Sequence, residues 1–107
     1  MNYINQKLAR NWFHLLSNNL CYEYEKMEID FAKKNRKKPK KFEDRKWKKV
    51  NGNNDKGGGN SKIIRDGLIF DKIGVNFSEV WGKFDNKFKN KIPGTDKKNS
   101  YYATGIS

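Results

Sequence analysis

The sequence predicts an α+β fold in which one long amphipathic helix is followed by antiparallel strands. Two patterns predict it: an apolar repeat of three or four residues through the first third of the chain, and alternating apolar and polar residues around an Asp-Gly pair farther on. At 107 residues the chain is at most one domain.

The helix is predicted from about residue 3 to residue 33. Its apolar positions recur on one face, and no proline or glycine interrupts them. They are Ile4, Leu8, Trp12, Leu15, Leu16, Leu20, Tyr24, Met27 and Phe31. We expect Trp12 and Phe13 to pack in the core, and the helix to lie along something large, such as a broad sheet or a partner subunit.

Four side chains of this helix are candidates for chemistry. Cys21, the only cysteine, falls within the apolar pattern, so we expect a buried, inert thiol and no internal disulfide. His14, the only histidine, has no carboxylate or nucleophile beside it and is expected to be a packed or partly exposed residue. Glu25 and Glu28 are expected on a solvated face rather than as paired acids. No spacing indicates a catalytic triad or a metal site.

The middle of the chain is basic and then rich in glycine. Residues 33–41 predict a solvated lysine-rich loop, and residues 46–50 a short strand between polar segments. Residues 51–60 predict a polar loop in which four of ten residues are glycine. A flexible connector is the favoured interpretation. A loop whose backbone amides contact a ligand is the alternative.

The remaining segments predict a hairpin and further secondary structure. Asp66-Gly67 lies between the apolar runs 61–65 and 68–72, which indicates a two-residue turn. Gly74 predicts a bulge or bend, followed by a strand over residues 75–80. Residues 85–91 predict a short helix that Pro93-Gly94 stops, and residues 101–107 predict the start of a strand.

The net charge of +12 favours an anionic partner, although 20 of the 24 basic residues are lysine. Nucleic-acid surfaces usually use arginine as well, and there are only 4 arginines. A solvated basic face, or one that attracts a small carboxylate-rich substrate, is therefore favoured over nucleic-acid binding. Neither a signal peptide nor a long apolar run occurs, so we expect no integral membrane segment and a cytoplasmic location.

The longest motif spans residues 69–82, which read Ile-Phe-Asp-Lys-Ile-Gly-Val-Asn-Phe-Ser-Glu-Val-Trp-Gly. It resembles a signature of the oxygen-dependent coproporphyrinogen III oxidase family, which reads Val-Phe-Glu-Lys-x-Gly-Val-Asn-x-Ser-x-Val-x-Gly. Other segments resemble the family's motifs in the same order: Ala9-Arg10-Asn11-Trp12-Phe13, a basic segment with Phe42 and Trp47, Gly57-Gly58-Gly59 with Lys56 in place of a fourth glycine, Ile92-Pro93-Gly94, and Ala103-Thr104-Gly105-Ile106-Ser107.

This resemblance implies a fold and an activity. The family converts two propionates of coproporphyrinogen III to vinyl groups, giving protoporphyrinogen IX in haem biosynthesis. It uses O2 as co-substrate and no organic cofactor, and some bacterial members use a divalent metal. The implied fold is a large antiparallel sheet flanked by helices, in a homodimer. Residues 1–107 are then expected to be the N-terminal portion of one such domain, incomplete by themselves.

The resemblance also implies site residues. Ser107 matches a substrate-binding position of the family, and Gly57, Gly58, Gly59 and Ser61 are expected to border the same pocket. The family's proton-transfer and metal-binding residues follow this region, so no catalytic or metal-binding residue is assigned and the chain alone is expected to be inactive. Two alternatives stay open: a small basic nucleic-acid-binding module, and a degenerate partner subunit.

Overall fold

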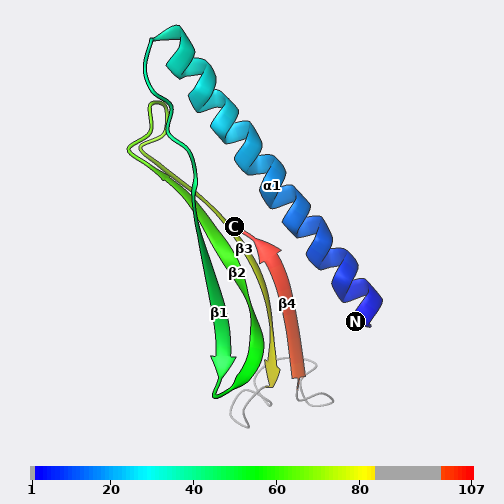
Figure 1. Ribbon diagram of the computed structural model, residues 1–107. Coiled ribbons are helices and arrows are strands. Elements are labelled where there is room, and N and C mark those ends of the chain that lie inside the picture. The colour runs from blue at the N-terminus through cyan, green and yellow to red at the C-terminus, as the bar shows by residue number, and fades with distance from the viewer. Residues whose placement is uncertain (1, 84–99) are drawn as a thin grey trace.

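One helix lies along one face of a four-stranded antiparallel sheet (Figure 1). The computed structural model describes residues 2–83 and 100–107. The elements are α1 (Tyr3–Lys34), β1 (Glu43–Asn51), β2 (Asn54–Arg65), β3 (Lys72–Lys83) and β4 (Ser100–Ile106), and the strand order is β1-β2-β3-β4. The predicted helix and the predicted strands at 46–50 and 101–107 are confirmed, with β1 longer than expected. The predicted helix over 85–91, with its Pro93-Gly94 stop, lies outside the described residues.

Local signals explain the bounds of α1. The Asn2 side chain accepts a hydrogen bond of 2.9 Å from the Asn5 amide and so caps the first turn. At the other end the Asn35 amide donates to the Phe31 carbonyl, and Lys33 and Lys34 lie in the last turn. Cations at that end favour the helix because the carbonyl dipoles point toward them.

The face of α1 that meets the sheet is not the predicted one. Its buried residues are Ser17, Cys21, Glu28 and Ala32, whereas much of the apolar stripe is exposed, with Trp12 at 61 % and Leu8 at 63 %. Ser17, Cys21 and Ala32 are small, so the helix can approach the sheet closely at these positions. The prediction that Trp12 packs in the core is therefore wrong, and the prediction of a buried Cys21 thiol is confirmed.

The core lies between α1 and the middle of the sheet. Ile64, Val75 and Phe77 supply its buried side chains from β2 and β3. His14 packs edge-on against Phe77 with ring centroids 5.1 Å apart, which confirms a packed histidine.

Two carboxylates of α1 hold the chain at one end of the sheet. Glu28 is fully buried and accepts hydrogen bonds of 2.8, 2.9 and 3.0 Å from the amides of Leu68, Ile69 and Phe70. Glu25 accepts from the Phe42 amide, just before β1, at 2.9 Å. The prediction that both acids lie on a solvated face is therefore wrong. These acids do not lie on a solvated face because a carboxylate can accept hydrogen bonds from several backbone amides at once.

These bonds also account for the pKa of Glu28. Burial alone would raise the pKa of its carboxyl group. The hydrogen bonds from three backbone amides favour the charged carboxylate and bring the pKa below its ordinary value.

The connection between β2 and β3 is longer than the predicted two-residue turn. The strands do form an antiparallel hairpin, but β2 ends at Arg65 and β3 begins at Lys72. Residues 68–70 are not strand, because their amides bind Glu28 instead of a neighbouring strand. Gly74 pairs regularly with Ile63, so the predicted bulge there is wrong. The irregularity in register lies in β1, between Lys48 and Val50.

The glycine run is strand rather than loop. Only residues 52–53 form the turn between β1 and β2, and Gly57, Gly58 and Gly59 lie in β2 between β1 and β3. A Cβ at any of the three would overlap a backbone carbonyl oxygen of a neighbouring strand. Gly57 also has a φ of 102°, which residues with a side chain rarely adopt. Close approach of backbones, not flexibility, therefore explains this run.

Candidate functional site

The strand register assigns side chains to the two faces of the sheet. Directly paired residues of antiparallel strands share a face, and successive residues alternate. Phe77 packs against His14, and Glu79 lies 3.6 Å from the Arg10 guanidinium, so these residues of β3 face α1. Asn76 and Ser78 consequently lie on the opposite face.

Two of the predicted site residues come together on that opposite face. Ser61 pairs with Asn76 across β2 and β3. Asn76 and Ser107 exchange backbone hydrogen bonds of 2.8 and 3.0 Å, and the Asn76 side-chain amide donates to the Ser107 hydroxyl at 3.4 Å. On the other side Ser61 pairs with Arg45 of β1. Arg45, Ser61, Asn76 and Ser107 therefore form one row across the whole sheet, which we call the polar row.

The polar row presents groups that bind carboxylates. A guanidinium and an amide nitrogen donate hydrogen bonds, and a serine hydroxyl donates or accepts one. Arg45, Asn76 and Ser107 are exposed and Ser61 is half-buried. The sequence signature contained Asn76 but did not identify it as a site residue. Arg45 was missed altogether, because only the register of β1 against β2 places it beside Ser61.

Beside the polar row the sheet is smooth over β2, β3 and β4, and an aromatic side chain of β1 borders this smooth part. The next set of paired residues is Trp47, Gly59, Ser78 and Gly105. A Cβ at Gly105 would meet no atom within 4 Å, so the space above this position is open among the described residues. A flat ligand can lie close to a backbone that carries such small side chains.

The three predicted glycines also border a space on the α1 side of the sheet. Gly57, Gly58 and Gly59 line a cavity of about 400 Å³ together with Arg10 and His14 of α1. The structure thus divides the five predicted residues: Ser61 and Ser107 belong to the polar row, and the three glycines lie in β2 beside a cavity under α1.

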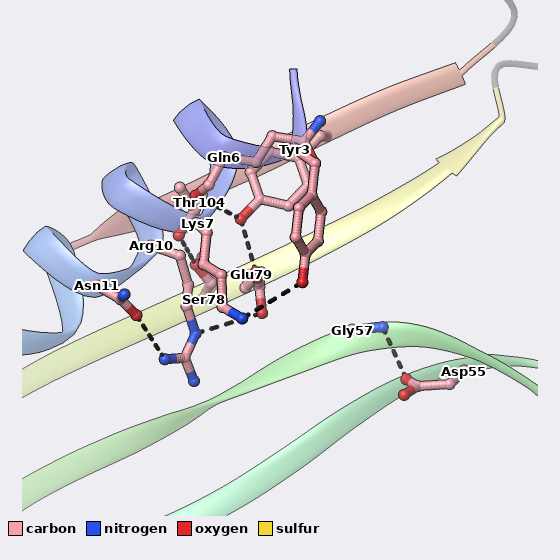
Figure 2. A network of polar contacts seen from close by, with 11 residues as sticks. Tyr3, Gln6, Lys7, Arg10, Asn11, Asp55, Gly57, Ser78, Glu79 and Thr104 are labelled. Carbon is pink, nitrogen blue, oxygen red and sulfur yellow. Dashed lines mark hydrogen bonds and ion pairs between the residues drawn. The ribbon is translucent and has the colours of Figure 1, made fainter. Parts of the chain in front are cut away.

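A larger cavity, of about 760 Å³, lies between the first turns of α1 and the ends of β3 and β4. Figure 2 shows Tyr3, Lys7 and Arg10 of α1 extending toward Glu79 of β3. The Tyr102 hydroxyl donates a 2.6 Å hydrogen bond to Glu79 and lies 3.3 Å from the Gln6 carbonyl. Burial, together with this bond to the Glu79 carboxylate, raises the pKa of Tyr102 to about 12.

Residues 2–83 and 100–107 contain neither a cluster of metal ligands nor a membrane-spanning helix. No group of three or more His, Cys, Asp or Glu side chains in these ranges is placed to hold a metal ion. The one helix in this part of the chain, α1, is not apolar enough over its length to cross a membrane.

Comparison with known proteins gives consistent matches. The family model described as Coproporphyrinogen III oxidase matches residues 8–107. An oxygen-dependent coproporphyrinogen-III oxidase from Rickettsia africae (strain ESF-5) is 40 % identical over 107 residues, and the match covers 100 % of this chain and 37 % of that protein. Proteins of the same name from Rickettsia felis and Rickettsia bellii (strain RML369-C) are 41 % and 38 % identical, covering 96 % and 100 % of this chain and 35 % and 37 % of theirs.

The matches cover nearly all of this chain but only part of each relative. The chain spans a little over a third of the length of these curated relatives, whereas nearly all of the chain is matched. No solved structure matches it.

Proposed function

The chain belongs to the coproporphyrinogen III oxidase family, and on this premise we propose that it forms the part of an oxygen-dependent coproporphyrinogen III oxidase that holds substrate carboxylates on the polar row. The enzyme would remove two propionate carboxyl groups as CO2 and leave vinyl groups, with O2 as co-substrate. The polar row, on the side of the sheet away from α1, is the observation that carries this proposal.

The chemistry of the substrate fits this face of the sheet. Coproporphyrinogen III is a tetrapyrrole that bears four propionates, so its recognition requires cations and hydrogen-bond donors around an open surface. Arg45 supplies a cation, Ser61, Asn76 and Ser107 supply donors, and Gly59 and Gly105 leave room for the macrocycle. The net charge of +12 adds a long-range attraction for such an anion.

The polar row would position the substrate rather than catalyse the reaction. Arginine, asparagine and serine side chains do not transfer protons readily near neutral pH. We therefore assign proton transfer to none of them. The described residues offer no ligand set for a divalent metal, so we assign metal binding to none of them. We further propose that the enzyme is a cytoplasmic homodimer that needs no organic cofactor.

The test is steady-state kinetics of the intact oxidase that contains this sequence, measured as aerobic release of CO2 from coproporphyrinogen III. Asn76→Asp would place a carboxylate where substrate carboxylates bind, and we expect KM to rise about 10-fold or more, a loss of about 1.4 kcal/mol in binding. Asn19→Asp, an exposed change on α1 with the same chemistry, is the matched control and should leave KM within about twofold.

Arg45→Gln provides a second test of substrate binding on the polar row. Removing its charge should raise KM with little change in kcat, because a binding contact is lost in both the ground and transition states. Wild-type KM in both Asn76→Asp and Arg45→Gln would show that the substrate does not use this face. No CO2 release from the unmodified protein would refute the oxidase activity itself.

A further inference from the structure

We propose that the larger cavity, between the first turns of α1 and the ends of β3 and β4, is a second binding site, for an aromatic or conjugated polycarboxylate. It lies under α1, whereas the polar row lies on the other face of the sheet. This inference does not depend on the oxidase activity.

The charges around the cavity favour an anion. Four cationic side chains line it, and Glu79 is the one carboxylate among the described lining residues; the cations are Lys7, Arg10, Lys56 and Lys83. Glu79 is already engaged by the Tyr102 hydroxyl and by Arg10. The side chains of Lys56 and Lys83 make no hydrogen bond or ion pair within the described part of the chain, so their ammonium groups are available to a ligand.

These cations come from three elements that converge on one space. Lys7 and Arg10 lie one turn apart on α1, Lys56 lies in β2 and Lys83 ends β3. Like charges gathered around one cavity repel each other, and a bound anion relieves that repulsion. Two or more carboxylates on one ligand can reach cations of different elements at once, which favours a polycarboxylate over a single acid.

The size and walls of the cavity favour an aromatic ligand. Its volume of about 760 Å³ falls within the range of about 300–1,000 Å³ typical of small-molecule sites. Tyr3, Trp81 and Tyr102 supply aromatic surface along its walls. The Lys7 ammonium lies 5.5 Å from the centroid of the Tyr3 ring, so charge and aromatic surface are already combined there (Figure 2).

The test is calorimetric titration of the intact protein with benzene-1,3,5-tricarboxylate, with benzene-1,3,5-tricarboxamide as the uncharged control. We expect saturable binding of the tricarboxylate, weakened by added salt, and none of the tricarboxamide. The double variant Lys7→Gln/Lys56→Gln should weaken binding at least 10-fold. The matched variant Lys26→Gln/Lys33→Gln removes the same charge from exposed positions of α1 outside the cavity and should change it less than twofold.

Each other outcome overturns the proposal. Equal weakening in the two double variants would show that only overall charge attracts the ligand. Weakening in Arg45→Gln instead would place the ligand on the polar row. Absence of saturable binding to the unmodified protein would refute the site. Thermal unfolding of each variant shows whether it is folded, and if Lys56→Gln unfolds the protein, Lys83→Gln replaces it.

Discussion

The two halves of α1 meet the sheet in opposite ways. The C-terminal half is fastened by carboxylates that accept backbone hydrogen bonds at Phe42 and at residues 68–70. The N-terminal half is joined by single side-chain contacts, such as those of Arg10 and Tyr102 with Glu79, around two cavities. A helix can therefore be anchored at one end and leave room for a ligand at the other.

The largest effect on stability is expected from removing the Glu28 carboxylate, which we call the anchor of α1. Glu28→Ala should lower the free energy of unfolding by about 4 kcal/mol, because three part-buried hydrogen bonds to backbone amides lose their charged acceptor. Denaturant unfolding of the intact protein measures it. Glu23→Ala, an exposed change on the same helix, is the control and should cost no more than about 0.5 kcal/mol. A similar small cost for both variants would mean that Glu28 does not anchor the loop.

A second substitution crowds the anchor instead of removing it. A Cβ at Gly67 would lie 2.5 Å from a Glu28 carboxylate oxygen and 2.6 Å from the Phe70 carbonyl oxygen. Gly67→Ala should therefore cost about 2–3 kcal/mol through overpacking. Gly105→Ala, where a Cβ meets nothing within 4 Å, should be nearly neutral in the same unfolding measurement. Equal stability of the two variants would contradict the close packing of this loop against Glu28.

The matching change in the N-terminal half should be smaller. Tyr102→Phe removes one hydroxyl and its hydrogen bond to the Glu79 carboxylate, which is worth about 2 kcal/mol. Because the cavity gives water access to Glu79, we expect no further penalty from an unsatisfied carboxylate. A loss as large as that of Glu28→Ala, seen in the same denaturant titrations, would show that the two halves are fastened equally.

The smallest expected effect is the change with pH in the contribution of Glu28 to the free energy of unfolding. The pKa of Glu28 is lower in the folded protein than in the unfolded chain, where it is about 4.3. Its contribution is therefore complete above the unfolded pKa and is lost as the pH falls through the folded pKa. The difference in unfolding free energy between wild type and Glu28→Gln should be constant near pH 7 and shrink at pH values below about 4. A difference that did not change with pH would exclude this role of the charge.

The sequence predicted the elements better than their contacts. Periodicity identified α1, and the Asp-Gly pair identified the hairpin of β2 and β3, because these are local patterns. Periodicity could not show which face of α1 meets the sheet, since the burial of Glu28 depends on a loop about 40 residues away. For the same reason a pair of acids on a helix looked like a solvated surface.

The family motifs named Ser61 and Ser107 as site residues, and the structure places both in one row of the sheet. That row also contains Asn76 and Arg45, and it depends on the register of four strands, which local sequence does not specify. The glycine run was interpreted as a loop because glycine is common in turns. Its need for glycine comes from the carbonyl oxygens of the strands on both sides, which only the assembled sheet reveals.

From the sequence separations of the contacts in the two halves of α1 we expect an order of folding. The anchoring contacts join residues 17 and 40 positions apart, whereas Tyr102 and Gln6 are 96 apart. Closing the longer loop costs about 0.8 kcal/mol more in chain entropy than closing one of 40 residues. During synthesis from the N-terminus, the anchored half can form once residue 70 has left the ribosome, while the cavity must wait for β4. A nascent chain would thus hold its helix in place before it has any site to fill.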